Sequence, residues 1–207
     1  EVILHGTIWD EANEKAKALV AERGYTYVHP FDDEHLIMGQ GTVGLEIAQD
    51  WPHVEVVVVP IGGGGLLAGI GCVMRALSPR TRVYAAEPAT AAPLAASFDA
   101  GAPVHFDNWT ASFVDGAGGK SVLPSMWPLL TDWVDESVVV SLDEAAAAMK
   151  LTAERCHVIV EGAAACAIAA ALSSAVQARH RRIVVVVSGG NIDLSRFATL
   201  VGACRSH

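Results

Sequence analysis

The chain alternates between valine-rich runs and segments with helical spacing. The runs Val54–Pro60, Arg82–Glu87, Val134–Val140 and Arg182–Val187 predict strands. The first and last are apolar at almost every position, which is typical of central strands in a parallel sheet covered on both faces. Strands that alternate with helices are joined by right-handed crossovers. We therefore predict an α/β fold, with an open, mostly parallel, twisted sheet and helices on both faces.

The remaining segments are predicted mainly as helices. Val2–His5 is a short apolar run, and Thr26–His29 reads as a further short strand. Gly101–Ser121 is rich in Gly, Asp and Asn and is expected to be irregular. Helical spacing, caps and glycine stops predict helices at the following places: Trp9–Arg23, Asp32–Trp51, Gly65–Leu77, Thr90–Ala100, Ser141–Arg155, Glu161–Arg179 and Asp193–Ala203.

The loops that follow the strands are the places to look for a site. In open parallel sheets, ligands bind beyond the carboxyl ends of the strands, here at Pro60–Gly65, Glu87–Ala92 and Ser188–Asn191. The glycine run Gly62–Gly65 opens a helix, whose unpaired N–H groups and partial positive charge attract anions. No Lys-Ser or Lys-Thr follows the run, so it is not a nucleotide-triphosphate loop. The alternative is that these glycines only let strand and helix pack closely.

A dinucleotide site is a competing interpretation of the same loop. Residues 63–68 fit the pattern G-x-G-x-x-A, and Glu87 ends the next strand, where a ribose-binding acid would lie. That fingerprint normally opens its domain, whereas here a long stretch precedes it. It also leaves the second glycine turn, Ser188–Asn191, without an explanation.

Several motifs taken together resemble one enzyme family. They are HPFDD, GQGTVGLEI, VVVPIGGGGLLAGI, YAAEPA, VDGAGG, VEGAAA and VVVVSGGNID. In this order, and over essentially the whole chain, they resemble the pyridoxal-phosphate (PLP) enzymes of the tryptophan-synthase-β fold, or fold type II. The resemblance is closest to threonine/serine dehydratases and serine racemase. It implies that residues 1–50 are a remnant of the smaller domain and residues 51–207 form the large PLP-binding domain.

The resemblance also implies a cofactor, PLP, and the residues that hold it. The glycine loop would wrap the phosphate with main-chain N–H groups, and Ser188 would bond the pyridine nitrogen. Gly116 would pass close to the ring. Glu161 would line the cofactor side of the pocket, or be only an acidic residue favoured by a helix dipole. The implied cofactor contacts are Gly62, Gly63, Gly64, Gly65, Leu66, Gly116, Glu161, Ser188 and Gly189.

No catalytic residue is assigned, because the Schiff-base lysine of the family, in its Ser-x-Lys-x-Arg context, is not found. The lysines are Lys15, Lys17, Lys120 and Lys150, and none has that setting. The chain therefore resembles the C-terminal portion of an ammonia-lyase that eliminates the β-hydroxyl of an amino acid, and we expect it to be inactive alone. A non-catalytic PLP- or phosphate-binding remnant and, less favoured, an NAD-binding domain remain as alternatives.

Two further expectations concern metals and partners. Glu87 keeps the first position of the family's cation site, but Pro93 lies where a second acid is expected, so no metal is predicted. The substrate class implied for the parent is a small amino acid. A truncated sheet would expose an edge and an apolar face, so we expect a homo-oligomer or a partner chain to cover them.

Composition and charge limit the partners, the cellular location and the cysteine chemistry that we expect for the chain. The formal net charge is -9 and no basic block occurs, which argues against nucleic acid and anionic membranes as partners. No secretory signal opens the sequence, so a cytoplasmic location is expected. The four cysteines form no CxxC pair and are expected to be reduced, buried thiols.

Overall fold

A computed structural model describes residues 1–204, in which four strands form one sheet. The strands are β1 (Val56–Pro60), β2 (Arg82–Pro88), β3 (Glu136–Val140) and β4 (Ile183–Val185). Their order is β3-β2-β1-β4, and every neighbouring pair is parallel. The chain thus builds the sheet outward from β1 in one direction and returns to place β4 on its other side. The predicted parallel α/β sheet is confirmed.

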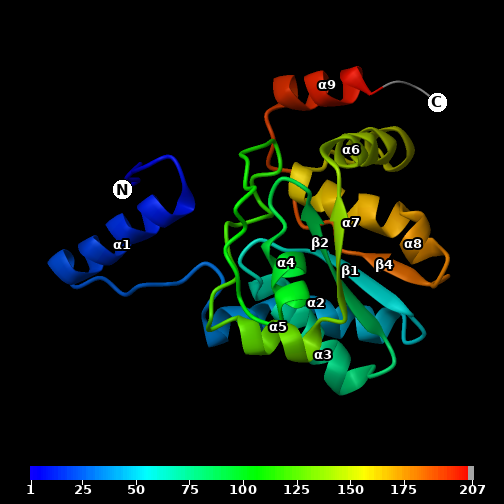
Figure 1. Cartoon of the computed structure of the whole chain (residues 1–207), viewed down its shortest axis with the longest axis horizontal. Coiled ribbons are helices and arrows are strands. Elements are labelled where there is room, and N and C mark those ends of the chain that lie inside the picture. The colour runs from blue at the N-terminus through cyan, green and yellow to red at the C-terminus, as the bar shows by residue number, and fades with distance from the viewer. Residues whose placement is uncertain (205–207) are drawn as a thin grey trace.

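Helices cover both faces of this sheet (Figure 1). Helices α6 to α9 lie over one face, and α2, α3 and α5 lie over the other. The bounds are α1 Trp9–Arg23, α2 Glu34–Asp50, α3 Gly65–Leu77, α4 Pro93–Ala100, α5 Trp127–Trp133, α6 Leu142–Cys156, α7 Gly162–Leu172, α8 Ser174–Gln177 and α9 Leu194–Ala203.

The central strand β1 shows why the valine runs do not alternate with polar residues. Val56 and Val58 pack into the apolar cluster under α6 and α7, whereas Val57 and Val59 pack into the cluster under α2, α3 and α5. All four are fully buried. Successive side chains of a strand point to opposite faces, so both faces of β1 must be apolar.

Glycines allow α2 to approach α3 closely despite their low helix propensity. A Cβ atom added at Gly69 would lie 2.5 Å from the carbonyl oxygen of Ile37, and one at Gly44 would lie 3.0 Å from Val73. Close contact of two helix backbones requires small residues at the crossing point. The segment predicted as part of the smaller domain therefore packs on a helix of the large one, and a domain division at residue 50 stays a prediction.

One predicted element at the N-terminal end is wrong. Thr26–His29 does not form a strand in the described residues, and neither does the short apolar run Val2–His5. An isolated strand needs a neighbour for its backbone hydrogen bonds, and no adjacent strand lies there. Their apolar residues stay at the surface, with Leu4 92% and Val28 72% exposed. Even so, within residues 1–204 no helix combines the length and the apolar character needed to cross a membrane.

Other differences have local causes. The predicted helix Glu161–Arg179 is interrupted at Ser173, whose backbone is extended and whose side chain accepts from the amide of Val176, which starts the short helix α8. Helix α5 was not predicted, because it has only 7 residues and carries a proline in its first turn. The cysteines are not uniformly buried either: Cys72 and Cys156 are exposed, and Cys166 is buried.

Candidate functional site

A cavity of about 300 Å³ lies beyond the carboxyl ends of β1 and β4. The glycine loop leaves β1 and the Ser188 turn leaves β4. These two parallel strands are neighbours at the point where the order of strands in the sheet reverses. Ligands of open α/β sheets bind at such switch points. The cavity is lined by Pro30, Phe31, Leu36, Gln40, Pro60, Gly62, Gly63, Gly64, Gly65, Leu66, Leu67, Gly116, Glu161 and Ser188.

The structure brings together eight of the nine residues that the sequence singled out as cofactor contacts, since all but Gly189 line this cavity. They come from four separate segments of the chain: the glycine loop, the turn at Gly116, the start of α7 at Glu161 and the turn at Ser188. Gly189 lies beside the cavity, and its carbonyl oxygen accepts a hydrogen bond of 3.1 Å from the amide of Glu161. Whether these residues contact a cofactor stays a prediction.

The glycine loop presents bare backbone to the cavity. Gly64 is the N-cap of α3, has φ +99 and forms no side-chain cap, so the first amides of the helix are left without an acceptor from their own helix. A positive φ of this size is strained for any residue with a side chain. A Cβ atom at Gly62 would lie 2.9 Å from the carbonyl oxygen of Gly116. Glycine is therefore required both for the turn and for the close approach of the two loops.

Phe31 forms a wall of the cavity that sequence reasoning missed. Its ring occupies the space where a side chain at Gly63 would lie, and its carbonyl oxygen is 2.9 Å from a Cβ added at Gly65. The imidazole Nδ1 of His29 accepts hydrogen bonds from the amides of Phe31 and Asp32, at 3.3 and 2.7 Å. His29 thus fixes the bend that carries Phe31. The HPFDD motif was the available signal, but it was used only for the resemblance.

Glu161 connects two of the loops. It is the N-cap of α7, yet its side chain does not cap that helix. Instead, Oε2 accepts a hydrogen bond of 3.1 Å from the amide of Asn191. Oε1 would lie 2.8 Å from a Cβ at Gly189 and 3.3 Å from one at Gly116. The carboxylate therefore faces the cavity between the Ser188 turn and the Gly116 turn.

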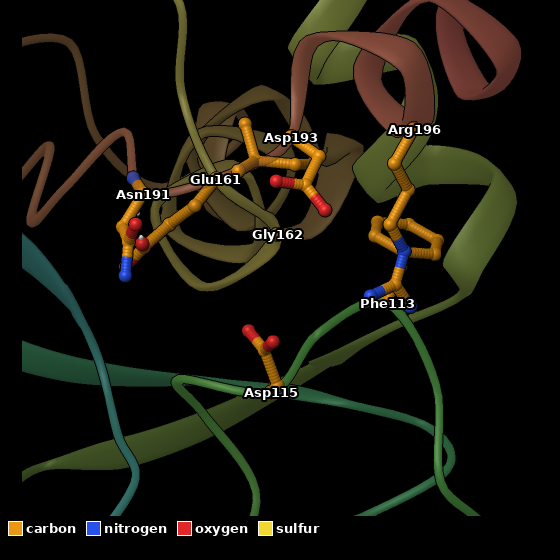
Figure 2. Close-up of a pocket in the computed structure, with 8 residues that line it drawn as sticks. Phe113, Asp115, Glu161, Gly162, Asn191, Asp193 and Arg196 are labelled. Atoms are coloured by element: carbon orange, nitrogen blue, oxygen red, sulfur yellow. Dashed lines mark hydrogen bonds between the residues drawn. The ribbon is translucent and has the colours of Figure 1, made fainter.

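A smaller cavity of about 120 Å³ adjoins the other side of Glu161. Figure 2 shows the carboxyl groups of Asp115 and Asp193 turned into this space, with the guanidinium of Arg196 at its side. One Nη atom of Arg196 donates to the carbonyl oxygen of Ser112 at 3.3 Å. The wall is thus strongly polar, and it contrasts with the glycine- and phenylalanine-lined cavity next to it.

Glu87, at the end of β2, is directed away from both cavities. It is 1% exposed, and its carboxyl oxygens accept from the amides of Leu94 and Ala95 and from the hydroxyl of Ser137, at 2.9, 2.8 and 2.6 Å. Burial raises the pKa of Glu87, and these three donors oppose the shift. Glu87 therefore holds the start of α4 and does not face the glycine loop as a ribose-binding acid would. In residues 1–204, no cluster of three His, Cys, Asp or Glu is arranged to hold a metal.

Comparison with known proteins decides the family. The family model described as "Pyridoxal-phosphate dependent enzyme" matches residues 1–189. The chain belongs to this family. It is 37% identical to an L-threonine ammonia-lyase of Thermotoga maritima over 97% of this chain and 50% of the relative. It is 40% identical to the L-threonine ammonia-lyase of Geobacter sulfurreducens, with the same two shares.

Solved structures agree with this family assignment. Maize serine racemase superposes with a TM-score of 0.88 and 32% identity over 96% of this chain and 61% of that one. The processed form of threonine deaminase isoform 2 from Solanum lycopersicum gives a TM-score of 0.89 and 33% identity over 97% of this chain and 59% of that one. The predicted resemblance to threonine dehydratases and serine racemase is confirmed. The chain spans about half the length of the curated relatives it matches.

Because the chain belongs to a PLP-dependent family, the positions of its lysines relative to the cavity matter. None of its lysines lines the cavity in the described residues. Lys15 and Lys17 lie on α1, which has no buried residue. The ammonium group of Lys120 lies 4.8 Å from the ring centre of Trp109, and that of Lys150 donates to the carbonyl oxygen of Cys204 at 3.0 Å.

Proposed function

We propose that the cavity at the end of β1 and β4 binds pyridoxal phosphate. We further propose that the whole protein is an ammonia-lyase acting on threonine or serine, of which this chain supplies the cofactor-binding part. The proposal rests on one observation: the glycine loop and Ser188 meet at adjacent strand ends and line one cavity. Bare amides at a helix start suit a phosphate dianion, and a hydroxyl nearby suits a heterocyclic nitrogen.

The residues present fit the cofactor in kind. The amides of the glycine loop and Leu66 would hold the phosphate, Ser188 would bond the pyridine nitrogen, and Gly116 leaves room beside the ring. When bound, PLP supplies an electron sink for elimination at the β-carbon of an amino acid. A neutral serine partner leaves that sink milder than a carboxylate partner would, which suits elimination. Phe31 lines the cavity on the side of α2.

We propose that the lysine which binds PLP covalently comes from outside this chain, so that residues 1–207 bind PLP reversibly and do not deaminate alone. Two surfaces support a covering partner. The N-terminal segment leaves Val2 and Leu4 88% and 92% exposed. Strand β4 is an edge of the described sheet and is built only of Ile and Val. A second copy or the remainder of the parent protein would cover them, and we place the assembly in the cytoplasm.

Titration with PLP, followed by its absorbance, tests the proposal. Wild-type chain should bind PLP saturably, and Gly64→Val should weaken binding at least about tenfold, because a side chain disturbs the αL turn that aims the amides. Gly101→Val is the matched control: Gly101 also has positive φ, +69, at a helix end with no atom within 4 Å of its would-be Cβ. It carries similar backbone strain away from the cavity.

Three results would contradict the proposal. They are no saturable PLP binding by the wild-type chain, equal weakening by both glycine variants, and saturable binding of NAD at the same cavity. Borohydride treatment with PLP should leave no specific pyridoxyl-lysine, and threonine or serine should release no ammonia. Specific labelling of Lys120 would show that this chain carries its own lysine after all.

A further inference from the structure

The carboxylate of Glu161 is tied to a turn that lies 27 to 30 residues further along the chain. The backbone amide of Glu161 donates to the carbonyl oxygen of Gly189 at 3.1 Å. The side-chain Oε2 of Glu161 accepts from the amide of Asn191, also at 3.1 Å. These two bonds enclose Gly190 between them. The turn follows the end of β4 and has no regular secondary structure of its own. Glu161, the N-cap of the buried helix α7, thus joins an otherwise irregular turn to the start of that helix.

The usual role of an acidic N-cap does not account for this geometry. An N-cap side chain normally accepts from the second or third amide of its own helix. The side chain of Ser141 does this at the start of α6, accepting from Glu144 at 3.2 Å. Glu161 forms no such cap on α7. Its carboxylate does not bond the first amides of α7 and accepts from the amide of Asn191 in the neighbouring turn instead.

The packing around the carboxylate restricts the turn further. Oε1 lies 2.8 Å from the place where a Cβ of Gly189 would be, and a Cβ at Gly190 would lie 2.5 Å from the carbonyl oxygen of Ile159. Both glycines therefore lie against the connection between α6 and α7 that ends at Glu161. Ser188 immediately precedes them, so the position of its hydroxyl at the cavity depends on how this turn is held.

From these contacts we infer that Glu161 is a positioning residue, which holds the turn Ser188–Asn191 so that the Ser188 hydroxyl faces the cavity. This rests on the proposed function, because the hydroxyl matters only if the cavity holds a ligand with a hydrogen-bonding heteroatom. The role of Glu161 is indirect: its carboxylate bonds the turn, and the turn presents the serine. Asp115, Asp193 and Arg196 face the adjoining polar cavity (Figure 2), whereas the Glu161 side chain accepts its hydrogen bond from the amide of Asn191.

The first test uses the chain without ligand and measures amide hydrogen exchange at Asn191. Glu161→Ala should speed exchange about tenfold or more, because it removes the acceptor. Glu161→Gln keeps an acceptor oxygen of the same reach and should stay within about threefold of wild type. Asp115→Asn, which removes a charge from the same polar wall, is the control and should leave Asn191 unchanged. Unchanged exchange in Glu161→Ala overturns the inference.

The second test is a double-mutant cycle on PLP affinity. Glu161→Ala should weaken PLP binding about tenfold in the wild-type background and should have no further effect once Ser188→Ala is present. Glu161→Gln should restore most of the affinity. An equal loss in both backgrounds would mean that the carboxylate contacts the ligand itself, and it would overturn the positioning role. If the wild-type chain binds no PLP, the proposed function fails, while the exchange test still decides the role of Glu161.

Discussion

Two glutamates lie at the carboxyl edge of the sheet and are used in opposite ways. Glu87 is 1% exposed, and its oxygens are occupied by the start of α4 and by Ser137. Glu161 is only partly buried, lines both cavities and holds one amide of a turn. Neither role could be assigned from residue type or from the element that precedes each glutamate, β2 for Glu87 and α6 for Glu161.

The difference between Glu87 and Glu161 shows which carboxylates at a sheet edge are available to a ligand. A carboxylate whose acceptor positions are filled by buried backbone donors stabilises the fold, and it has little left to offer a ligand. A carboxylate that faces a cavity, with its own helix left uncapped, is available to shape a site. By this criterion the glutamate of the YAAEP motif is structural in this chain, and the glutamate of the VEGAAA motif lines the candidate site.

The largest expected effect is on stability. Glu87→Ala should lower the free energy of unfolding by about 3 kcal/mol or more, because it leaves two amides and a hydroxyl unsatisfied in the interior. Glu161→Ala should cost no more than about 1 kcal/mol, since its surroundings admit water. Urea unfolding followed by circular dichroism measures both. Similar losses in the two variants would remove the distinction between the two glutamates.

The next effect is a dependence on pH. Burial raises the pKa of Glu87 above 4.5, so the folded state holds this proton more tightly than the unfolded state does. Its stabilising contribution is complete below the unfolded pKa and is lost as pH rises through the folded pKa. The advantage of wild type over Glu87→Gln should therefore shrink from about pH 4.5 toward neutrality, by about 1.4 kcal/mol for each unit between the two pKa values.

Glu144 provides the control of opposite sign. Hydrogen bonds from the backbone and side chain of Ser141 lower its pKa, so its contribution is present above the unfolded pKa and is lost as pH falls. The advantage of wild type over Glu144→Gln should grow with rising pH. Parallel pH profiles for the Glu87 and Glu144 variants, in urea titrations at several pH values, would contradict the assigned burial of Glu87.

The smallest effect is expected at the opposite end of the sheet. Glu136, at the start of β3, forms a bidentate pair with Arg179 at 2.6 and 3.0 Å, and both side chains are well exposed. Exposed pairs contribute about 0 to 1 kcal/mol. Glu136→Gln should therefore lower thermal stability by less than either change at Glu87, and 1 M salt should reduce the difference further. A loss as large as that of Glu87→Ala would show that exposure does not decide the ranking.

Much of the sheet and of the cavity at its carboxyl edge could be predicted from the sequence. Unbroken valine runs such as Val56–Val59 can only be central strands, and loops that follow such strands converge at one edge. The glycine loop and Ser188 could therefore be predicted at one site from the sequence. The periodicity carries this information because it reflects burial, and Val56–Val59 are fully buried.

The remainder depended on tertiary contacts that no local pattern encodes. Phe31 lines the cavity only because α2 packs on α3 through facing glycines, which carries the preceding bend to the glycine loop. The strand expected at Thr26–His29 does not form, because strand formation requires a partner that lies elsewhere in sequence. Glu161 had two interpretations with equal support, and only the direction of its side chain distinguishes them.

The bend at Phe31 gives the molecule an optical property. The indole of Trp9 lies with its ring centre 5.3 Å from that of Phe31, and Phe31 borders the cavity beside Gly63. A single aromatic contact thus separates a natural fluorophore from the space that a near-ultraviolet chromophore would fill. A chromophore bound in the cavity would therefore be expected to quench the emission of Trp9, so that α1 would report on binding at the sheet without an added label.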